Sequence, residues 1–98
     1  MYSKDDKHRL YWLIDQYLSS EIDESTFCDE FYYVFDLGID YSTLSETEYQ
    51  TFEELDSVSS RFSEFENDHK IAPQAFKTAQ ELREKIIETK ERLKKQWL

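Results

Sequence analysis

The sequence of 98 residues has a formal net charge of −10, with 39% hydrophobic and 16% aromatic residues. This length allows a single domain over residues 1–98, and the aromatic content is typical of a folded chain. One glycine and one proline disfavour many short strands joined by tight turns. No apolar run approaches the roughly 20 residues of a membrane span, no signal-like segment opens the sequence, and the single Cys28 cannot form an internal disulfide. We therefore expect a cytoplasmic protein.

The negative charge is concentrated in the middle of the chain. Residues 21–70 contain fifteen acidic and two basic residues, with aromatic residues among the acids. The first 20 residues are balanced, whereas residues 71–98 contain four acidic and seven basic residues. Charge this uneven says little about the fold, but it indicates a surface that meets a basic partner.

The first helix is predicted over about residues 5–19. Its apolar residues follow the i, i+3, i+4, i+7, i+8 spacing of one helical stripe, namely Leu10, Leu13, Ile14, Tyr17 and Leu18. Trp12 falls almost opposite this stripe. We expect a neighbouring loop or helix end to cover it, the alternative being an exposed contact site.

The second helix is predicted to begin after Asp23, a natural N-cap residue, and to end at Gly38, a typical C-cap glycine. Its core stripe is Phe27, Phe31, Val34 and Phe35. A capping box of the S-x-x-E kind, Ser45 to Glu48, then starts a third helix at about Glu46. This third helix is predicted to end at residues 67–70. Its core side is Phe52, Leu55, Val58, Phe62 and Phe65.

The fourth helix is predicted to start near Pro73, which suits a first helical turn. Its apolar stripe is Phe76, Ala79, Leu82, Ile86, Leu93 and Trp97. Four amphipathic helices with short connections pack most simply as an antiparallel four-helix bundle. We therefore predict an all-α fold with Phe31, Phe62 and Leu82 in its core.

No catalytic, metal or cofactor site is predicted. The only histidines are His8 and His69, and neither is paired in the sequence with a nucleophile. Glu66 and His69 match one Glu-x-x-His motif, but di-metal bundle sites need two such motifs and further carboxylates. No glycine-rich loop is present to bind phosphate. Direct nucleic-acid binding is disfavoured because the aromatic residues lie among acids that repel phosphates.

Two predicted helix faces instead combine acids with tyrosines and carry almost no compensating base. The outer face of the second helix has Asp29, Tyr33 and Asp36 at the spacing i, i+4, i+7, and the outer face of the third has Tyr49, Glu53, Asp56 and Glu64. Ordinary solvated helices mix charges of both signs, and an unbalanced face costs stability through self-repulsion. Tyrosine is enriched at binding hot spots. We therefore expect a protein-binding surface rather than an ordinary solvated face. The predicted interface residues are Asp29, Tyr32, Tyr33, Asp36, Asp40, Tyr41, Tyr49, Glu53, Asp56 and Glu64.

A family resemblance sharpens this expectation. The stretches LIDQYL at 13–18 and EIDESTF at 21–27, followed by Phe31, resemble the opening of the colicin D-type immunity proteins. This family includes immunity partners of contact-dependent growth inhibition toxins. The stretch FEELD at 52–56, then Phe62 and a charged final helix, is similar to the rest of the pattern. The likeness covers roughly residues 10–93, and most matched positions are core apolar residues.

The resemblance implies a non-enzymatic helical protein that binds a basic nuclease toxin, often one that cleaves tRNA, and covers its active site. It supplies no binding residues, so the interface residues rest on charge and helical spacing alone. The alternative is an acidic helical adaptor, or a nucleic-acid mimic that regulates a host nucleic-acid-binding protein. A small metal-dependent enzyme is a third and weaker hypothesis. Neither the toxin nor the oligomeric state follows from the sequence.

Overall fold

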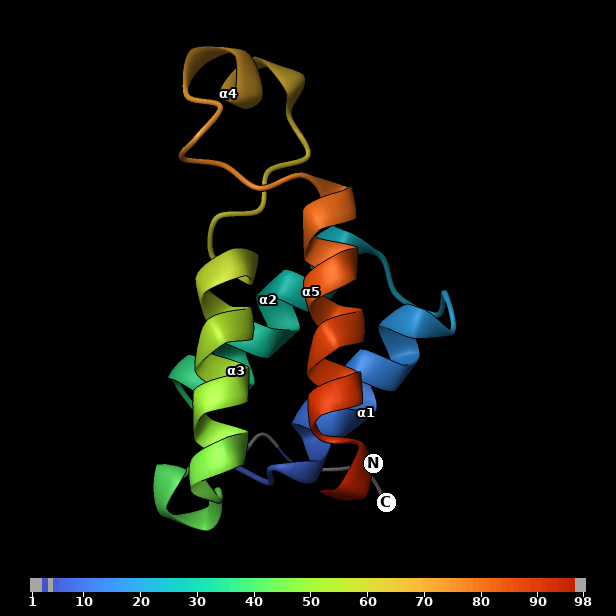
Figure 1. The fold of residues 1–98 in the computed structure, drawn as a ribbon, viewed down its shortest axis with the longest axis vertical. Helices are drawn as coiled ribbons and strands as arrows, with labels where there is room; N and C mark the ends of the chain where they lie inside the picture. Colours follow the sequence, from blue (N-terminus) through green and yellow to red (C-terminus); the bar gives the residue numbers. More distant parts are fainter. Residues whose placement is uncertain (1–2, 4, 97–98) are drawn as a thin grey trace.

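The computed structural model describes residue 3 and residues 5–96 of the chain. Within these residues the fold is all-α, with four main helices and no strand, which confirms the predicted class. The main helices are α1 (His8–Leu18), α2 (Glu24–Phe31), α3 (Glu46–Ser59) and α5 (Ala79–Arg92). Figure 1 shows α3 and α5 side by side and running in opposite directions, with the short helix α4 (Glu66–Ile71) beyond one end of the pair. Among the described helices, none combines the length and apolarity that crossing a membrane demands.

Side-chain caps fix the starts of three main helices. The Asp23 carboxylate accepts the Thr26 backbone N–H at 2.9 Å, as its predicted N-cap role requires. The predicted capping box of Ser45 and Glu48 is present at the start of α3. A second capping box, formed by Thr78 and Glu81, starts α5.

The second helix changes its winding before it ends. After α2 the backbone continues as a π-helix, η1 (Tyr32–Asp36), and a short 3-10 helix, η2 (Tyr41–Thr43), precedes α3. The predicted C-cap role of Gly38 is wrong, because no glycine among the described residues has a positive φ. The backbone N–H groups of Gly38 and Ile39 both bond the Val34 carbonyl oxygen, at 3.1 and 2.8 Å. This shared acceptor ends the helix without a left-handed residue.

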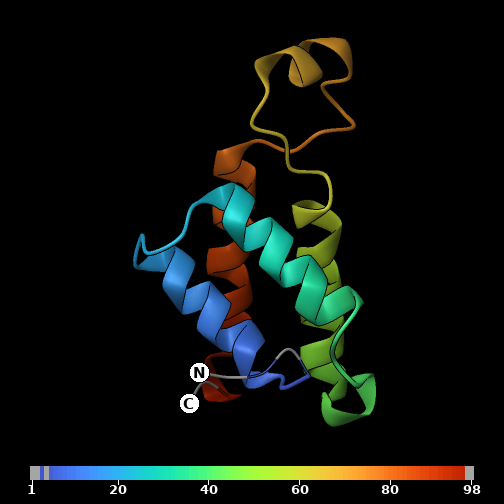
Figure 2. The same ribbon diagram turned by 180° about the vertical axis from the view of Figure 1, so that it is seen from behind.

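The core lies between α1 and α2 on one side and α3 and α5 on the other, as Figures 1 and 2 show from opposite sides. A row of stacked rings forms its centre, with Phe31 5.5 Å from both Phe27 and Phe35. Phe52 of α3 packs edge-on against Tyr11 of α1 at 5.6 Å. Trp12 is half-buried against this core, and the Arg9 guanidinium lies 5.3 Å from the centre of its ring. The predicted covering of Trp12 therefore comes in part from its own helix.

The third and fourth helices are shorter than predicted. Helix α3 ends at Ser59, and α5 begins at Ala79, well after Pro73. Residues 61–78, which we call the lobe, lie beyond the ends of both helices and contain α4 (Figure 1). The core prediction for Phe65 is consequently wrong, since Phe65 is 64% exposed, and that for Phe62 holds only in part, since Phe62 is half-buried against the edge of the core.

The predicted stripe of the last helix is partly wrong. Phe76 precedes the helix, and Ala79 is exposed at its first turn. Leu82, Ile86 and Leu93 are buried as predicted. Trp97 lies outside the described residues.

A β-bridge joins the two ends of the lobe, and hydrogen bonds connect residues inside it. Phe62 and Lys77 form an isolated β-bridge, in which the Ser63 N–H donates to the Lys77 carbonyl oxygen at 3.1 Å. The Ser63 hydroxyl donates to the Asp68 carboxylate at 2.6 Å and accepts the Phe65 N–H at 3.1 Å. A ring nitrogen of His69 lies 2.8 Å from the Ser63 carbonyl oxygen. Ser63 thus organises the turn that follows α3, because its side chain replaces helical backbone bonds.

Candidate protein-binding surface

Two tyrosines surround a buried ring where η1, η2 and α3 meet. The Phe35 ring, 3% exposed, lies 5.4 Å from the Tyr41 ring and 6.2 Å from the Tyr49 ring. The Tyr41 and Tyr49 rings meet edge to face at 5.4 Å. The Tyr41 hydroxyl donates to the Phe35 carbonyl oxygen at 2.7 Å, which fixes its ring. Tyr41 and Tyr49 nevertheless remain 43% and 38% exposed, so these well-held rings present area to a partner.

Three carboxyl groups, those of Asp36, Glu53 and Asp56, adjoin these tyrosines. Burial, followed by a hydrogen bond with Asp36 and the charges of Asp36 and Glu53, raises the pKa of Asp56 to about 7. Asp56 therefore binds a proton more readily than an ordinary aspartate does. We call Asp36, Tyr41, Tyr49, Glu53 and Asp56 the tyrosine–acid cluster.

The negative field of the cluster also reaches its phenols. Burial, and after it the charges of Asp36, Asp56 and Glu53, raise the pKa of Tyr41. A hydrogen bond with Glu53, and then the charge of Glu53, raise the pKa of Tyr49. Both phenols therefore keep their protons at neutral pH, and the cluster presents hydrogen-bond donors together with negative charge.

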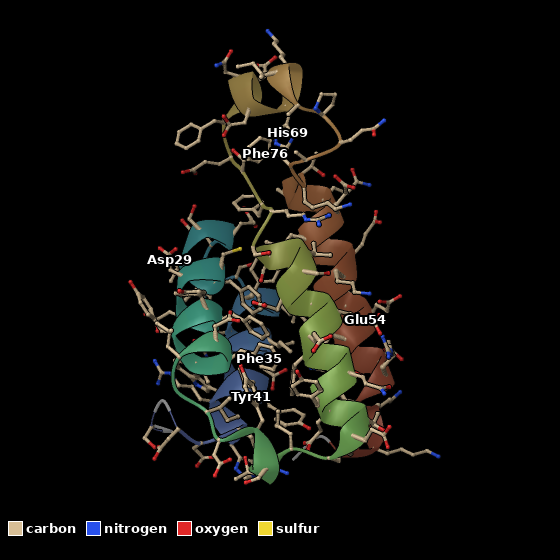
Figure 3. All side chains as sticks on the ribbon, turned by 90° about the vertical axis from the view of Figure 1, so that its left-hand side faces the viewer. Asp29, Phe35, Tyr41, Glu54, His69 and Phe76 are labelled. Atoms are coloured by element: carbon tan, nitrogen blue, oxygen red, sulfur yellow. The ribbon has the colours of Figure 1, made fainter. Side chains whose placement is uncertain are left out.

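Within the part of the chain that the structure describes, the cluster has no cationic partner, whereas several other acids do. None of the ion pairs among residues 3 and 5–96 involves Asp36, Glu53 or Asp56. Glu54, the next residue after Glu53, is paired with Lys85 at 3.1 Å and Arg92 at 2.8 Å. Figure 3 shows Glu54 on the side of α3 that faces α5, whereas Phe35 and Tyr41 lie on its other side. The negative charge is therefore balanced on one side of α3 and unbalanced on the other.

The structure divides the ten predicted interface residues into separate groups. Five form the tyrosine–acid cluster, so the faces predicted on the second and third helices do meet. Asp29, Tyr32 and Glu64 instead line a groove beside the lobe. Tyr33 is 46% exposed, with its ring 5.9 Å from that of Tyr32.

Two of the ten residues have a setting that the sequence did not indicate. The Asp40 carboxylate caps η2, accepting the backbone N–H of Ser42 at 2.9 Å and its hydroxyl at 2.7 Å. These bonds lower the pKa of Asp40. Glu64 lies after the end of α3, so its predicted place on the outer face of that helix is wrong.

The π-helix explains why the predicted stripe of Asp29, Tyr33 and Asp36 divides. That stripe assumes the α-helical spacing of i, i+4 and i+7, but η1 is wound with i→i+5 bonds. The wider turn rotates residues after Tyr32 relative to those before it. Asp36 consequently faces α3, while Asp29 faces the groove.

A network of buried hydrogen bonds around Glu48 supports the tyrosine–acid cluster. Glu48, 2% exposed, accepts hydrogen bonds from the Tyr11 hydroxyl, the Lys7 ammonium and the Ser45 backbone N–H. Although burial opposes ionisation, these three bonds hold the pKa of Glu48 below its usual value. The network ties the start of α3, and with it Tyr49, to α1. Only the capping role of Glu48 was visible in the sequence.

Other chemistry finds little support among the described residues. No three His, Cys, Asp or Glu side chains there come together in a way that could hold a metal ion. His69, from the Glu-x-x-His motif, is bonded to the Ser63 carbonyl and packs against Phe76 at 6.3 Å.

Comparisons with family models, with curated proteins and with solved structures find no match to this chain.

Proposed function

We propose that this chain is an immunity protein, which binds a bacterial nuclease toxin and neutralises it by covering the basic active-site cleft. The proposed scaffold is an antiparallel four-helix bundle, and the proposed place of action is the cytoplasm. The resemblance of residues 10–93 to colicin D-type immunity proteins suggests this function, and the tyrosine–acid cluster supports it from physical chemistry. The toxin would be an RNase, such as a tRNase, of the colicin or contact-dependent growth inhibition kind.

The observation that carries the proposal is that no lysine or arginine among the described residues is paired with Asp36, Glu53 or Asp56. Glu54, on the side of α3 that faces α5, is instead paired with Lys85 and Arg92. Keeping unpaired carboxyl groups close together destabilises the free protein, and a basic partner would relieve this repulsion on binding. The raised pKa of Asp56, which comes first from burial and then from its hydrogen bond with Asp36 and the charges of Asp36 and Glu53, reflects this destabilisation in part.

A nuclease that binds a polyanion presents a basic cleft, and the cluster offers it an alternative to phosphate. The exposed tyrosine rings supply rigid contact area at the centre, while the carboxylates pair with lysine and arginine around them. Opposite fields also speed encounter, with association rates of about 10⁸–10⁹ M⁻¹s⁻¹ at low salt. Fast capture suits a protein that must act before the toxin cleaves its substrate.

The second candidate is an acidic helical adaptor or nucleic-acid mimic directed at a host protein. The same cluster favours it, because closely spaced carboxylates beside aromatic rings also resemble phosphates and bases. The partner distinguishes the two candidates. An immunity protein inhibits one nuclease, whose gene lies directly upstream of its own.

The test is an inhibition titration with the nuclease domain encoded directly upstream. RNA cleavage should fall to background when the two proteins are equimolar. The double variant Tyr49→Ala with Glu53→Lys should lose this inhibition, and its helical circular dichroism should be unchanged. Glu84→Lys with Glu88→Lys on α5 is the control and should inhibit like the wild type. Cleavage that continues at a large molar excess of the wild-type protein would refute the proposal.

A further inference from the structure

A groove of about 490 Å³ opens between α2 and the lobe, apart from the tyrosine–acid cluster. Asp29 and Tyr32 lie on its α2 side, and Glu64, Phe65 and Phe76 on its lobe side. In Figure 3, Asp29 lies on α2 towards the lobe, while Phe35 and Tyr41 lie towards the other end of the molecule. The sequence did not predict this groove, because it depends on the turn that ends α3 at Ser59.

The groove is lined by aromatic rings that remain open to solvent. Phe65 is 64% exposed and Tyr32 is 49% exposed, whereas Phe62 and Phe76 are half-buried. Covering an exposed phenylalanine lowers the free energy of the complex, because removing apolar area from water is favourable. A planar or aliphatic group is therefore a favourable occupant of this groove.

Hydrogen bonds hold the lobe side of the groove in place. Ser63 bonds Asp68 through its hydroxyl and Lys77 through its backbone N–H, and the Lys77 N–H donates to the Arg61 carbonyl at 2.8 Å. His69 closes the same turn by bonding the Ser63 carbonyl. An ordered wall of this kind lowers the entropy that a binding partner must remove.

The charge of the lining selects a cation. Three carboxylates, Asp29, Glu64 and Asp68, border the groove, and no lysine or arginine is among its described lining residues. Asp29 and Glu64 are exposed, so a basic group can reach both. Arginine fits best, because its flat guanidinium stacks on aromatic rings and donates several hydrogen bonds to carboxylates.

We propose that this groove is a second contact surface, which receives an arginine-bearing segment of a protein partner. If the proposed function holds, the segment belongs to the same nuclease, and the lobe extends the contact beyond the tyrosine–acid cluster. The groove itself does not depend on that function, since its charge and rings favour any arginine-bearing protein segment.

The test uses the full-length ¹⁵N-labelled protein and a short blocked peptide with arginine at alternate positions. Backbone amide shifts should centre on Asp29, Tyr32 and Phe65. The same peptide with citrulline in place of arginine keeps the shape without the charge, and it should cause no such shifts. Shifts centred on the tyrosine–acid cluster, or no saturable shift, would overturn the proposal.

Two charge-matched variants complete the test. Asp29→Asn with Glu64→Gln should weaken peptide binding by about fivefold or more, because charge-assisted bonds are lost. Glu84→Gln with Glu91→Gln removes the same charge from α5 and should change binding by less than about twofold. If both variants weaken peptide binding equally, only net charge determines binding, and the proposal that the groove is the binding site is overturned. A nuclease that is not inhibited, beside a peptide that binds here, would refute the proposed function and leave the groove standing.

Discussion

Asp36 and Asp56 share a hydrogen bond between their carboxyl groups where η1 meets α3, and the pKa of Asp56 is about 7 as a result of burial and this contact. A residue of η1 thus influences the titration of Asp56 on α3, beside Tyr41 and Tyr49. An acidic pair in the folded state makes stability depend on pH, because the unfolded chain separates the two groups.

The sign of this dependence follows from the direction of the shift. The pKa of Asp56 is raised on folding, so between about pH 4 and pH 7 the folded state binds more protons than the unfolded state. The contribution of Asp56 to the free energy of unfolding is therefore complete at acidic pH and is lost as pH rises through about 7.

Asp56→Asn should remove this loss, because its amide N–H can donate to Asp36 at any pH. At pH 8 the variant should be more stable than the wild type by about 1–2 kcal/mol, after discounting for a half-exposed group, and at pH 5, nearer the ordinary pKa of aspartate, the gain should be clearly smaller. Urea unfolding at both pH values measures the difference. Asp29→Asn on α2 removes the same charge outside the tyrosine–acid cluster and is the matched control. If the stability gain of Asp56→Asn is the same at pH 5 as at pH 8, it does not come from the titration of Asp56.

Core substitutions should distinguish α3 from the lobe. Phe52 is fully buried among the rings of Phe31, Phe35 and Tyr11, so Phe52→Ala should cost about 3–5 kcal/mol of unfolding free energy. Phe65→Ala should change it by less than about 0.5 kcal/mol, because Phe65 is 64% exposed. Chemical denaturation measures both values. A large loss of unfolding free energy for Phe65→Ala would show that Phe65 belongs to the core, as its helical spacing predicted.

The helix starts could be predicted because their signals are local. Asp23 and the capping box of Ser45 and Glu48 need only neighbouring backbone, and they are present where the sequence indicated. The capping box of Thr78 and Glu81 was equally visible, but Pro73 suggested an earlier start. Local signals therefore located the helices better than the spacing of apolar residues located their ends.

The end of α3 was missed because Phe62 and Phe65 continue its apolar spacing. The Ser63 hydroxyl competes with helical backbone bonds, because it donates to Asp68 and accepts the Phe65 N–H. The spacing of apolar residues does not predict such side-chain bonds. The π-helix of η1 was missed as well, because the α-helical spacing of apolar residues does not distinguish i→i+4 from i→i+5 bonds. The meeting of Asp36 with Asp56 was expected from helix faces, but the separation of Asp29 from them was not.

The Glu48 network should contribute stability of the opposite pH sign. Glu48→Ala leaves the Tyr11 hydroxyl and the Lys7 ammonium without this partner and should cost about 1–3 kcal/mol at pH 7. Because the pKa of Glu48 is lowered on folding, its contribution should be present at neutral pH and lost as pH falls below its unfolded value. Glu46→Ala, at an exposed position of the same turn, should cost far less. Equal losses would show that capping alone matters.

Binding kinetics should separate the two parts of the tyrosine–acid cluster. Asp36→Lys with Glu53→Lys should mainly slow association with the nuclease and flatten its salt dependence. Tyr49→Ala should mainly speed dissociation, by an amount equivalent to about 2 kcal/mol if its ring is central. Surface plasmon resonance at several salt concentrations measures both rates. If Glu84→Lys with Glu88→Lys on α5 weakens binding as much, the interface lies elsewhere.

The most direct measurement is proton release when the nuclease domain binds. With a pKa of about 7, Asp56 is partly protonated at pH 7, and a partner's basic group beside it would drive that proton off. Calorimetry in buffers of different ionisation enthalpy should therefore show net proton release when the wild type binds at pH 7. The Asp56→Asn variant should bind and release none from this site. Tight binding of the wild type with no proton release would contradict an interface at the tyrosine–acid cluster.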